Sequence, residues 1–213
     1  HDMPGRPGIN PMTVTGGKRA ILVPEPMRER LRFLTKFGLS VRRGDHYGLI
    51  LGFQVDPRDL KANLAAIAEA ASKSDIVVAS IHAHRQGAWL TKFAHQAIEH
   101  GANIVFMHGP HKVGPIELYR GCPIFYSMGD FVFEIRYVTR FPAEAYEAVG
   151  LPHDAPTHDY AKARAYKLER PQSYKGIAAS VAFATNRKRV ACVRVLPIDL
   201  QFTAENENRG RPQ

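Results

Sequence analysis

Histidine is the residue type whose distribution in this sequence most clearly indicates chemistry. Six of the ten histidines lie between positions 82 and 111, namely His82, His84, His95, His100, His108 and His111. Four of them form two short clusters, one ending in His82-Ala83-His84 and the other in His108-Gly109-Pro110-His111. A neutral imidazole is a good ligand for zinc, iron or manganese. Two such pairs could therefore hold a metal ion if the fold brought them together.

Each cluster directly follows a short apolar run of strand length. The first run is Asp75–Ile81 and the second is Asn103–Met107, and both suit strands that are buried on both faces of a sheet. In parallel α/β sheets, ligands bind beyond the carboxyl ends of the strands. We therefore expect the two histidine pairs to lie at one edge of a sheet, with the Gly109-Pro110 turn aiming the second pair at a common point.

The alternative to a metal site is a structural role, because a single histidine at a strand end is usually a hydrogen-bonded loop residue. Two histidine pairs after adjacent strands favour metal binding over that alternative without excluding it. His95 and His100 lie within a predicted helix and are interpreted as non-functional. His46, His153 and His158 have no informative context.

The remaining pattern alternates strands with helices, which is typical of an α/β sheet. Strands are predicted at Lys18–Val23, Tyr47–Val55, Ile116–Tyr119 and Ile124–Ser127, the last two separated by a turn over Arg120–Pro123. Helices are predicted at Pro26–Phe37, from an N-cap at Asp56 to about Ser72, at Trp89–His100 and at Ala143–Val149. A loop-rich excursion is expected at about 135–175. A β-hairpin is predicted from Ile177–Ala184 and Val190–Leu196.

Composition excludes several classes of protein. With 213 residues and 45% apolar residues, the chain suits one ordinary folded domain. Its longest apolar runs are far shorter than the roughly 20 residues of a membrane-spanning helix. Two cysteines cannot build a disulfide scaffold, and neither is assigned as a nucleophile; they only weakly favour a reducing compartment such as the cytoplasm.

The net charge of +9 lies in the flanks of the chain. Residues 1–50 and 135–213 each carry an excess of +5, whereas residues 51–134 carry −1. Because the sequence has no recognisable nucleic-acid-binding motif, nucleic acid is an unlikely partner. Basic flanks are more often solvated surface, but they could also steer an anionic substrate.

The two histidine blocks resemble the CapA family of bacterial capsule and poly-γ-glutamate biosynthesis, within the calcineurin-like metallophosphoesterase superfamily. The resemblance is carried by Asp75–His84, by Gly101–His111 and by Ile116–Tyr119 continuing into Ile124–Phe133. Arg6–Pro11 and Leu196–Leu200 also resemble the family, so most of the chain is covered. Three residues depart from the family pattern. Asp130 stands where Asn is usual, and Met107 stands where a glycine is usual. Arg85 stands where relatives often carry an acidic residue nearby.

The resemblance implies a sandwich of two β-sheets flanked by helices, with a dinuclear centre of divalent metals (Mn, Fe, Zn or Ca) at the strand ends. His82, His108 and His111 match metal ligands of the family. His84 is then a ligand or a nearby acid/base group, and Glu117 orients a histidine through a hydrogen bond. Apart from the resemblance, Arg85 could hold an anionic group if it faces the site. Nothing in the chain matches the half of the superfamily domain that carries Asp and Asn-His ligands. The chain is therefore expected to be the C-terminal part (1–213) of a single domain, completed by an N-terminal segment or a second chain.

Three functions follow as hypotheses. The first is a metal-dependent hydrolase with phosphate esters as the default substrate class. The second uses the same centre on a peptide or polyglutamate chain, as an amide hydrolase, transferase or epimerase, because fold does not determine the reaction. The third is a non-catalytic module that binds a polyanion through the basic flanks. The family resemblance also leaves a location at the bacterial envelope open.

Overall fold

The computed structural model describes residues 10–22, 39–41, 46–84, 87–133, 138–167, 170–184, 189–204 and 209–213. For 16–22, 39–41, 46–52 and 165–167 it describes the backbone alone. The chain divides into two compact units: the first comprises 1–77 and 85–102, and the second comprises 78–84 and 103–213. Each unit is described by itself below.

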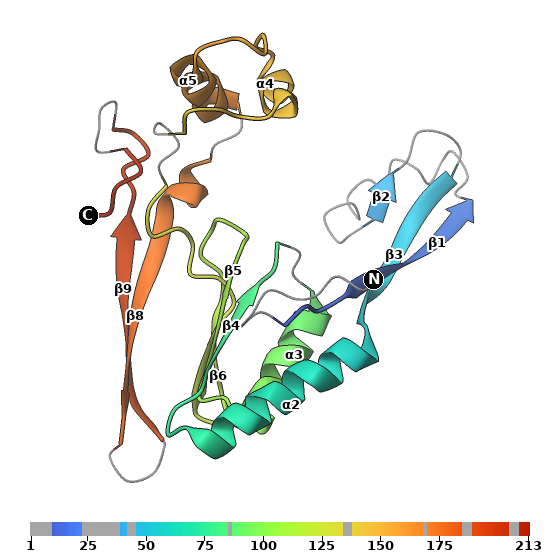
Figure 1. The fold of residues 1–213 in the computed structure, drawn as a ribbon, viewed down its shortest axis with the longest axis vertical. Coiled ribbons are helices and arrows are strands. Elements are labelled where there is room, and N and C mark those ends of the chain that lie inside the picture. Colours follow the sequence, from blue (N-terminus) through green and yellow to red (C-terminus); the bar gives the residue numbers. More distant parts are fainter. Residues whose placement is uncertain are drawn as a thin grey trace. The chain divides into compact units, whose positions relative to one another are not determined.

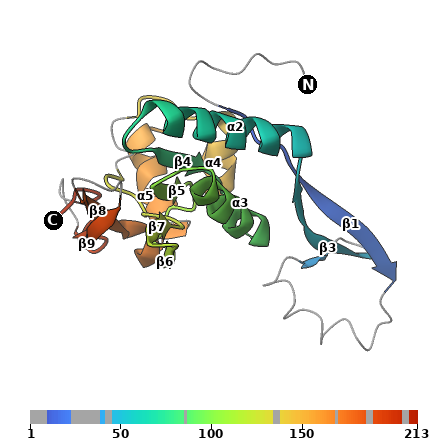
Figure 2. The same cartoon turned by 90° about the horizontal axis from the view of Figure 1, so that it is seen from below.

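The first unit contains an antiparallel sheet with the strand order β1-β3-β2. Its strands are β1 (Val14–Leu22), β2 (Leu39–Val41) and β3 (His46–Val55). In Figure 2, β1 and β3 form a long ribbon, and β3 leads directly into the helix that follows it. The strands predicted around 18–23 and 47–55 are thus confirmed. The helix predicted at Pro26–Phe37 lies outside the described residues.

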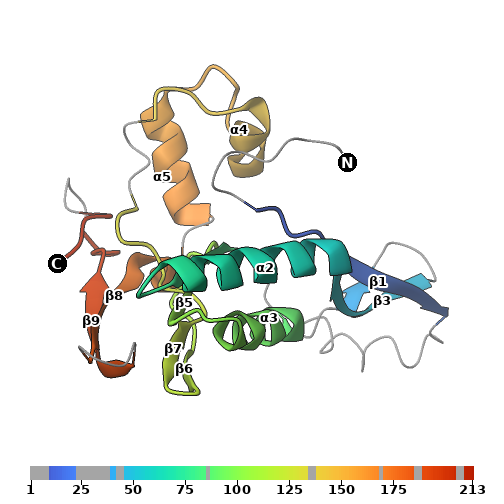
Figure 3. The ribbon, with the colours of Figure 1, turned by 60° about the horizontal axis from the view of Figure 1, so that its bottom comes forward.

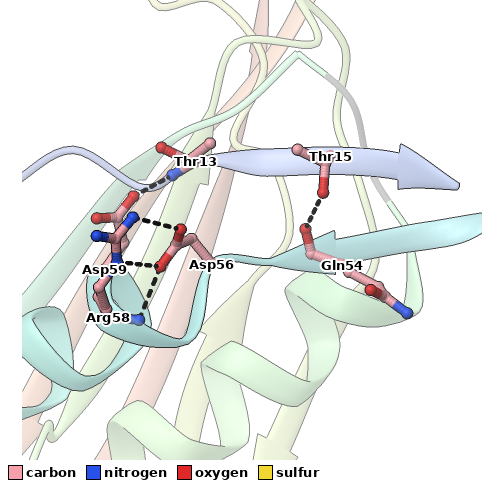
Figure 4. Close-up of polar contacts among 6 residues, drawn as sticks. All are labelled: Thr13, Thr15, Gln54, Asp56, Arg58 and Asp59. Atoms are coloured by element: carbon pink, nitrogen blue, oxygen red, sulfur yellow. Dashed lines mark hydrogen bonds and ion pairs between the residues drawn. The ribbon is translucent and has the colours of Figure 1, made fainter. Parts of the chain in front are cut away.

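Helix α2 (Pro57–Lys73) begins where the sequence predicts. The Asp56 carboxylate accepts a hydrogen bond from the backbone N–H of Arg58 at 2.8 Å and also contacts the Arg58 guanidinium, as Figure 4 shows. Asp59 in the first turn accepts a hydrogen bond from the backbone N–H of Thr13 at 2.7 Å. Asp56 therefore caps the helix, and Asp59 holds the chain that leads into β1.

Helix α3 (Ala88–Glu99) lies beside α2 in the same unit (Figure 3). Leu90, Phe93 and Ala97, which were predicted to share one face, are all buried. The chain leaves the helix through Gly101, whose φ is +105°, and a Cβ there would lie 2.5 Å from the Cβ of Ala71 on α2. Only glycine fits this position, because it must both adopt a left-handed conformation and allow the helices to approach.

The second unit is built on a four-stranded sheet with the order β4-β5-β7-β6. Its strands β4, β5 and β6 are labelled in Figure 1. Its strands are β4 (Val78–His82), β5 (Ile104–His108), β6 (Ile116–Tyr119) and β7 (Cys122–Phe125). The first three in this order are parallel, and β6 is antiparallel to β7. Val105, Met107, Ile124 and Phe125, on the two central strands, are at most 1% exposed and form the core of this sheet.

Two expectations for this sheet are wrong. β4 is not buried on both faces, because it is an edge strand whose residues alternate between exposed and half-buried. The turn predicted at Arg120–Pro123 spans only Arg120 and Gly121, and Cys122 already pairs with Tyr119. Both turn residues have positive φ, +50° and +79°, which is the conformation of a tight two-residue hairpin.

The expected excursion is more regular than predicted. It contains α4 (Ala143–Val149), as expected, and also α5 (Thr157–Lys167) and a short 3-10 turn, η2 (Pro171–Tyr174). Helix α5 was missed because it has no clear apolar stripe; it packs mainly through Tyr160 against Tyr146 and Val149 of α4. The hairpin β8 (Lys175–Phe183) and β9 (Val190–Asp199) is confirmed and forms a third sheet.

The described residues therefore form a mixed α/β protein, as the strand–helix alternation predicts. The two-sheet sandwich and the single domain remain predictions. Across the described ranges, every helix is too short or too polar to cross a membrane.

The cap of α2 yields a first prediction. Hydrogen bonds from the side chain and then the backbone of Arg58 hold the pKa of Asp56 below its ordinary value of 3.8. The stabilisation is therefore fully present above that value and is lost as pH falls through the lowered pKa. We expect Asp56→Ala to lower the thermal unfolding temperature at neutral pH, with the difference from wild type disappearing in strong acid, as measured by circular dichroism.

Asp56→Asn is the matched control, because an amide oxygen can still cap the helix without a charge. It should unfold much closer to wild type than Asp56→Ala does at neutral pH. Equal losses in both variants would contradict the capping role.

Candidate functional site

The two histidine clusters meet at the carboxyl edge of the four-stranded sheet. In the parallel pair of β4 and β5, His82 stands directly opposite His108. His84 follows β4 by two residues and His111 follows β5 by three. The predicted convergence of the clusters is therefore confirmed, and its cause is the pairing register of these two strands.

The imidazole rings of this edge contact one another. His82 Nδ1 lies 2.8 Å from His108 Nδ1, and His82 Nε2 lies 3.1 Å from His84 Nε2. The ring centroids of both pairs are 4.8 Å apart, in edge-on arrangements. Each contact needs one protonated and one unprotonated nitrogen, so the tautomers of the three rings are coupled.

His108 is the least exposed of these histidines. Its Nε2 lies 3.2 Å from the hydroxyl of Ser80, which projects from the same face of β4 as His82. Burial, and to a lesser degree the neighbouring His82, hold the pKa of His108 below its ordinary value of 6.5. His108 is therefore neutral at physiological pH, which is the form of imidazole that binds metals.

A close backbone approach brings the two loops together. Gly109 has a φ of +120°, and a Cβ there would lie 3.0 Å from the carbonyl carbon and oxygen of Ala83, just before His84. His111 ends the turn with a φ of +52°, a conformation that is uncommon for a residue other than glycine. Strained backbone of this kind clusters at functional sites, where the surrounding structure enforces it.

A third strand contributes to the same edge. After β7, the chain places Asp130 beside His111. The Nδ1 of His111 lies 3.0 and 3.1 Å from the two carboxylate oxygens of Asp130. The ring of Phe133 meets that of His111 edge-on at a centroid distance of 6.3 Å. All three parallel strands therefore deliver polar or aromatic side chains to one edge of the sheet.

Backbone contacts hold the segment that carries Asp130. Met128 donates to the carbonyl of Met107 on β5 at 3.3 Å and accepts from the N–H of Ile177 on β8 at 2.9 Å. Gly129 and Gly176 then form an isolated antiparallel bridge. A Cβ on Gly129 would lie 2.4 Å from the carbonyl oxygen of Lys175, so this crossing of two segments requires glycine.

The other candidate residues have different surroundings. Glu117 on β6 accepts a hydrogen bond of 2.6 Å from the hydroxyl of Tyr126, and its predicted role in orienting a histidine stays a prediction. Arg85 lies outside the described residues. Burial raises the pKa of the Cys122 thiol, which therefore stays protonated and is no activated nucleophile.

The donor set suits a divalent metal chemically, since it combines neutral imidazoles with a nearby carboxylate. Within the described ranges, no three His, Cys, Asp or Glu side chains are arranged as a ready-made metal site. The facing ring nitrogens are in hydrogen-bond contact with one another, at 2.8 and 3.1 Å. Two nitrogens bound tetrahedrally to one zinc stand about 3.3 Å apart. Metal binding therefore requires the rings to turn from one another toward a common point.

Sequence reasoning missed Ser80, Asp130 and Phe133 as members of this site. Ser80 could have been found from the two-residue period of a strand, which places it on the same face as His82. Asp130 had a weaker signal, namely the departure from the Asn that is usual in the resembling family. The contact of Phe133 with His111 depends on the path of the chain after β7 and has no local signal.

The close approach at Gly109 yields a second prediction. We expect Gly109→Ala to destabilise the protein by more than about 1 kcal/mol, because it adds backbone strain and a clash with Ala83. The histidine ring resonances in NMR spectra should also shift, since the two loops must separate. Gly121→Ala is the control, because Gly121 also has positive φ but a Cβ there would meet nothing within 4 Å. Identical histidine spectra in the two variants would contradict the role of the contact.

Comparisons with known proteins show which sequences this chain resembles. Residues 20–135 match the profile of the bacterial capsule synthesis protein family, PGA_cap. Two proteins of Sinorhizobium fredii, both described as uncharacterized, are each 28% identical to the chain over 248 aligned residues, which cover 99% of this chain and 52% of each relative. The chain thus spans about half the length of these relatives.

Shorter matches carry informative names. The PGA biosynthesis protein CapA of Bacillus subtilis is 36% identical over 83 residues, which cover 37% of this chain and 22% of that protein. A probable polyglutamine synthesis accessory protein of Mycobacterium tuberculosis is 35% identical over 96 residues, covering 42% of this chain and 25% of that protein. Because the family profile covers more than half of the chain, including both histidine clusters and Asp130, the chain belongs to the PGA_cap family of bacterial capsule synthesis proteins.

Proposed function

We propose that this chain is the histidine-bearing part of a metal-dependent hydrolase, with phosphate esters as its default substrate class. One observation carries the proposal: His82 and His108 are register partners on adjacent parallel strands, with His84, His111 and Asp130 at the same edge. Such an edge is the usual ligand-binding position of a parallel sheet. The metallophosphatase-like sandwich implied by the CapA resemblance belongs to the same proposal.

In this proposal, His82, His108 and His111 hold the divalent metal, whether Mn, Fe, Zn or Ca. When bound, a pair of such ions lowers the pKa of a water molecule and stabilises charge on the attacking and leaving oxygens. The protein contributes neutral ring nitrogens, which the lowered pKa of His108 favours. Partial burial at β5 also limits the access of bulk water to His108.

His84 is proposed to deliver a proton to the leaving group. It lies in the loop just after β4, its side chain is exposed, and its Nε2 is within 3.1 Å of His82 Nε2. An exposed imidazole beside the ligands can exchange protons with solvent and present one to a substrate oxygen. Arg85, the next residue, would hold an anionic group of the substrate.

The substrate partner is proposed to be anionic or peptide-like. The chain carries a net charge of +9, concentrated outside the histidine region, which favours the approach of anions. Carboxylate ligands from an N-terminal segment or a second chain would complete the centre. The match covers 52% of each Sinorhizobium relative, so these relatives contain further residues that could include such a segment.

A second candidate function has its own support. The names of the Bacillus and Mycobacterium relatives refer to PGA biosynthesis and to polyglutamine synthesis. The same centre would then act on a peptide or polyglutamate chain, as an amide hydrolase, transferase or epimerase. Both candidates use the same histidines, so they differ in substrate rather than in site.

The metal assignment yields a third prediction. Purified protein, freed of metal and titrated with Zn²⁺ or Mn²⁺, should bind the ion, and His108→Ala or His111→Ala should weaken binding by at least about 100-fold, because each removes a proposed ligand. Isothermal calorimetry and elemental analysis measure this. His100→Ala is the control, since that ring nitrogen contacts the carbonyl of Gln96 in α3. Equal affinity in all variants would refute the ligand assignment.

The choice of substrate yields a fourth prediction. With metal bound and the carboxylate-bearing segment or second chain present, the protein should hydrolyse a chromogenic phosphodiester. His84→Gln should then lower kcat by about 100-fold or more, because it removes the proposed proton donor. The second candidate predicts instead the cleavage or modification of γ-linked glutamate oligomers, followed by mass spectrometry. A third outcome would favour a non-catalytic binding module: neither reaction occurs, and the protein binds a polyanion in a salt-sensitive way even after the histidines are replaced.

A further inference from the structure

We propose that Asp130 is a positioning residue of the histidine cluster, which holds the Nδ1 proton of His111 and leaves its Nε2 as the nitrogen available to a metal. The role of Nε2 toward a metal rests on the proposed function. The hydrogen-bonded state of the ring does not, and it can be tested without any metal.

The direction of the hydrogen bond follows from the chemistry of the two groups. An ionised carboxylate has only acceptors, so the contacts of 3.0 and 3.1 Å to His111 Nδ1 require that this nitrogen carry the proton. In a neutral ring the lone pair must then be on Nε2. Carboxylates that accept from the far nitrogen of a metal-binding histidine commonly select the tautomer and raise the basicity of the ligand.

Further contacts hold the ring of His111 in place. Phe133, on the same loop as Asp130, meets the His111 ring edge-on. The centroids of the His84 and His111 rings are 5.8 Å apart. Phe133 is itself held, because its ring meets that of Tyr174 at 5.4 Å and the Arg164 guanidinium lies over it at 5.1 Å. The loop after β7 therefore restrains both the proton and the plane of the His111 ring.

Close backbone packing also constrains the position of Asp130. A Cβ on Gly176 would lie 2.2 Å from the carbonyl oxygen of Asp130, so strand β8 presses directly against this residue. The Asp130 side chain is only 17% exposed, whereas that of His111 is 53% exposed. An ion pair with one partner so exposed contributes little to stability, which makes a purely stabilising role a weak explanation for this arrangement.

The test reads the tautomer of His111 directly. In ¹⁵N-labelled, metal-free protein at about pH 8, where unperturbed imidazoles are neutral, long-range ¹H–¹⁵N spectra distinguish Nδ1–H from Nε2–H rings. His111→Gln assigns the signal. We expect Nδ1–H in wild type, a shift to predominantly Nε2–H in Asp130→Ala, and partial retention in Asp130→Asn, whose amide oxygen can still accept. An Nε2–H ring in wild type, or no change in Asp130→Ala, overturns the proposal.

Glu147→Gln is the matched control. Glu147 Oε1 lies 3.0 Å from His153 Nε2 in an exposed carboxylate–histidine pair of the same unit. This variant should leave the His111 signal unchanged. A shift of the His111 ring in Glu147→Gln would mean that any lost carboxylate produces the effect, and would overturn the specific assignment to Asp130.

Metal titration of the same variants tests the second half of the proposal. Asp130→Ala should weaken Co²⁺ or Zn²⁺ binding by about 10- to 100-fold and Asp130→Asn by less, with an unchanged Co²⁺ absorption spectrum. A changed spectrum would make Asp130 a direct ligand and overturn the positioning role. If wild type binds no metal while the tautomer depends on Asp130, the proposed function fails and the positioning role stands.

Discussion

The pairing register of β4 and β5 is the constraint on which the rest of the site depends. Side chains alternate between the two faces of a strand, so a slip of one residue would turn His82 to the face opposite His108. The register is supported by the core, because Val105 and Met107 on β5 are completely buried on one face while His108 emerges at the strand end. Burial of two apolar side chains thus determines where two imidazoles meet.

The loop after β7 completes the site because its backbone is shared between two sheets. Met128 is bonded to β5 on one side and to β8 on the other, and the Gly129–Gly176 bridge brings the segments into direct backbone contact. The C-terminal hairpin, far away in sequence, therefore controls the placement of Asp130. This dependence explains why two glycines without chemistry of their own are needed beside Asp130.

The electrostatic surroundings of His108 favour its neutral form. Burial at β5 lowers the pKa of His108, and the neighbouring His82 acts in the same direction to a lesser degree because crowded imidazoles disfavour a second positive charge. His108 is therefore neutral at physiological pH, and the carboxylate of Asp130 lies beside His111 in the same cluster.

Local patterns in the sequence predict most of the elements. Apolar spacing and the Asp56 cap mark α2, the stripe of Leu90, Phe93 and Ala97 marks α3, and Gly101 marks its end. These signals are reliable because they reflect interactions between residues close together in the chain. By contrast, α5 was missed because its few core contacts leave no periodic pattern, and the apolar run of β4 does not reveal that one of its faces is exposed.

By itself, the sequence determined that two histidine pairs follow two strands, and hence that they belong at one edge of a parallel sheet. Only the tertiary structure decided which nitrogens face one another, that Ser80 reaches His108, and that Asp130 reaches His111. The physical reason is the range of the interactions involved. Strand ends follow from neighbouring residues, whereas these contacts depend on strand register, on positive-φ turns and on a glycine crossing between segments almost 50 residues apart.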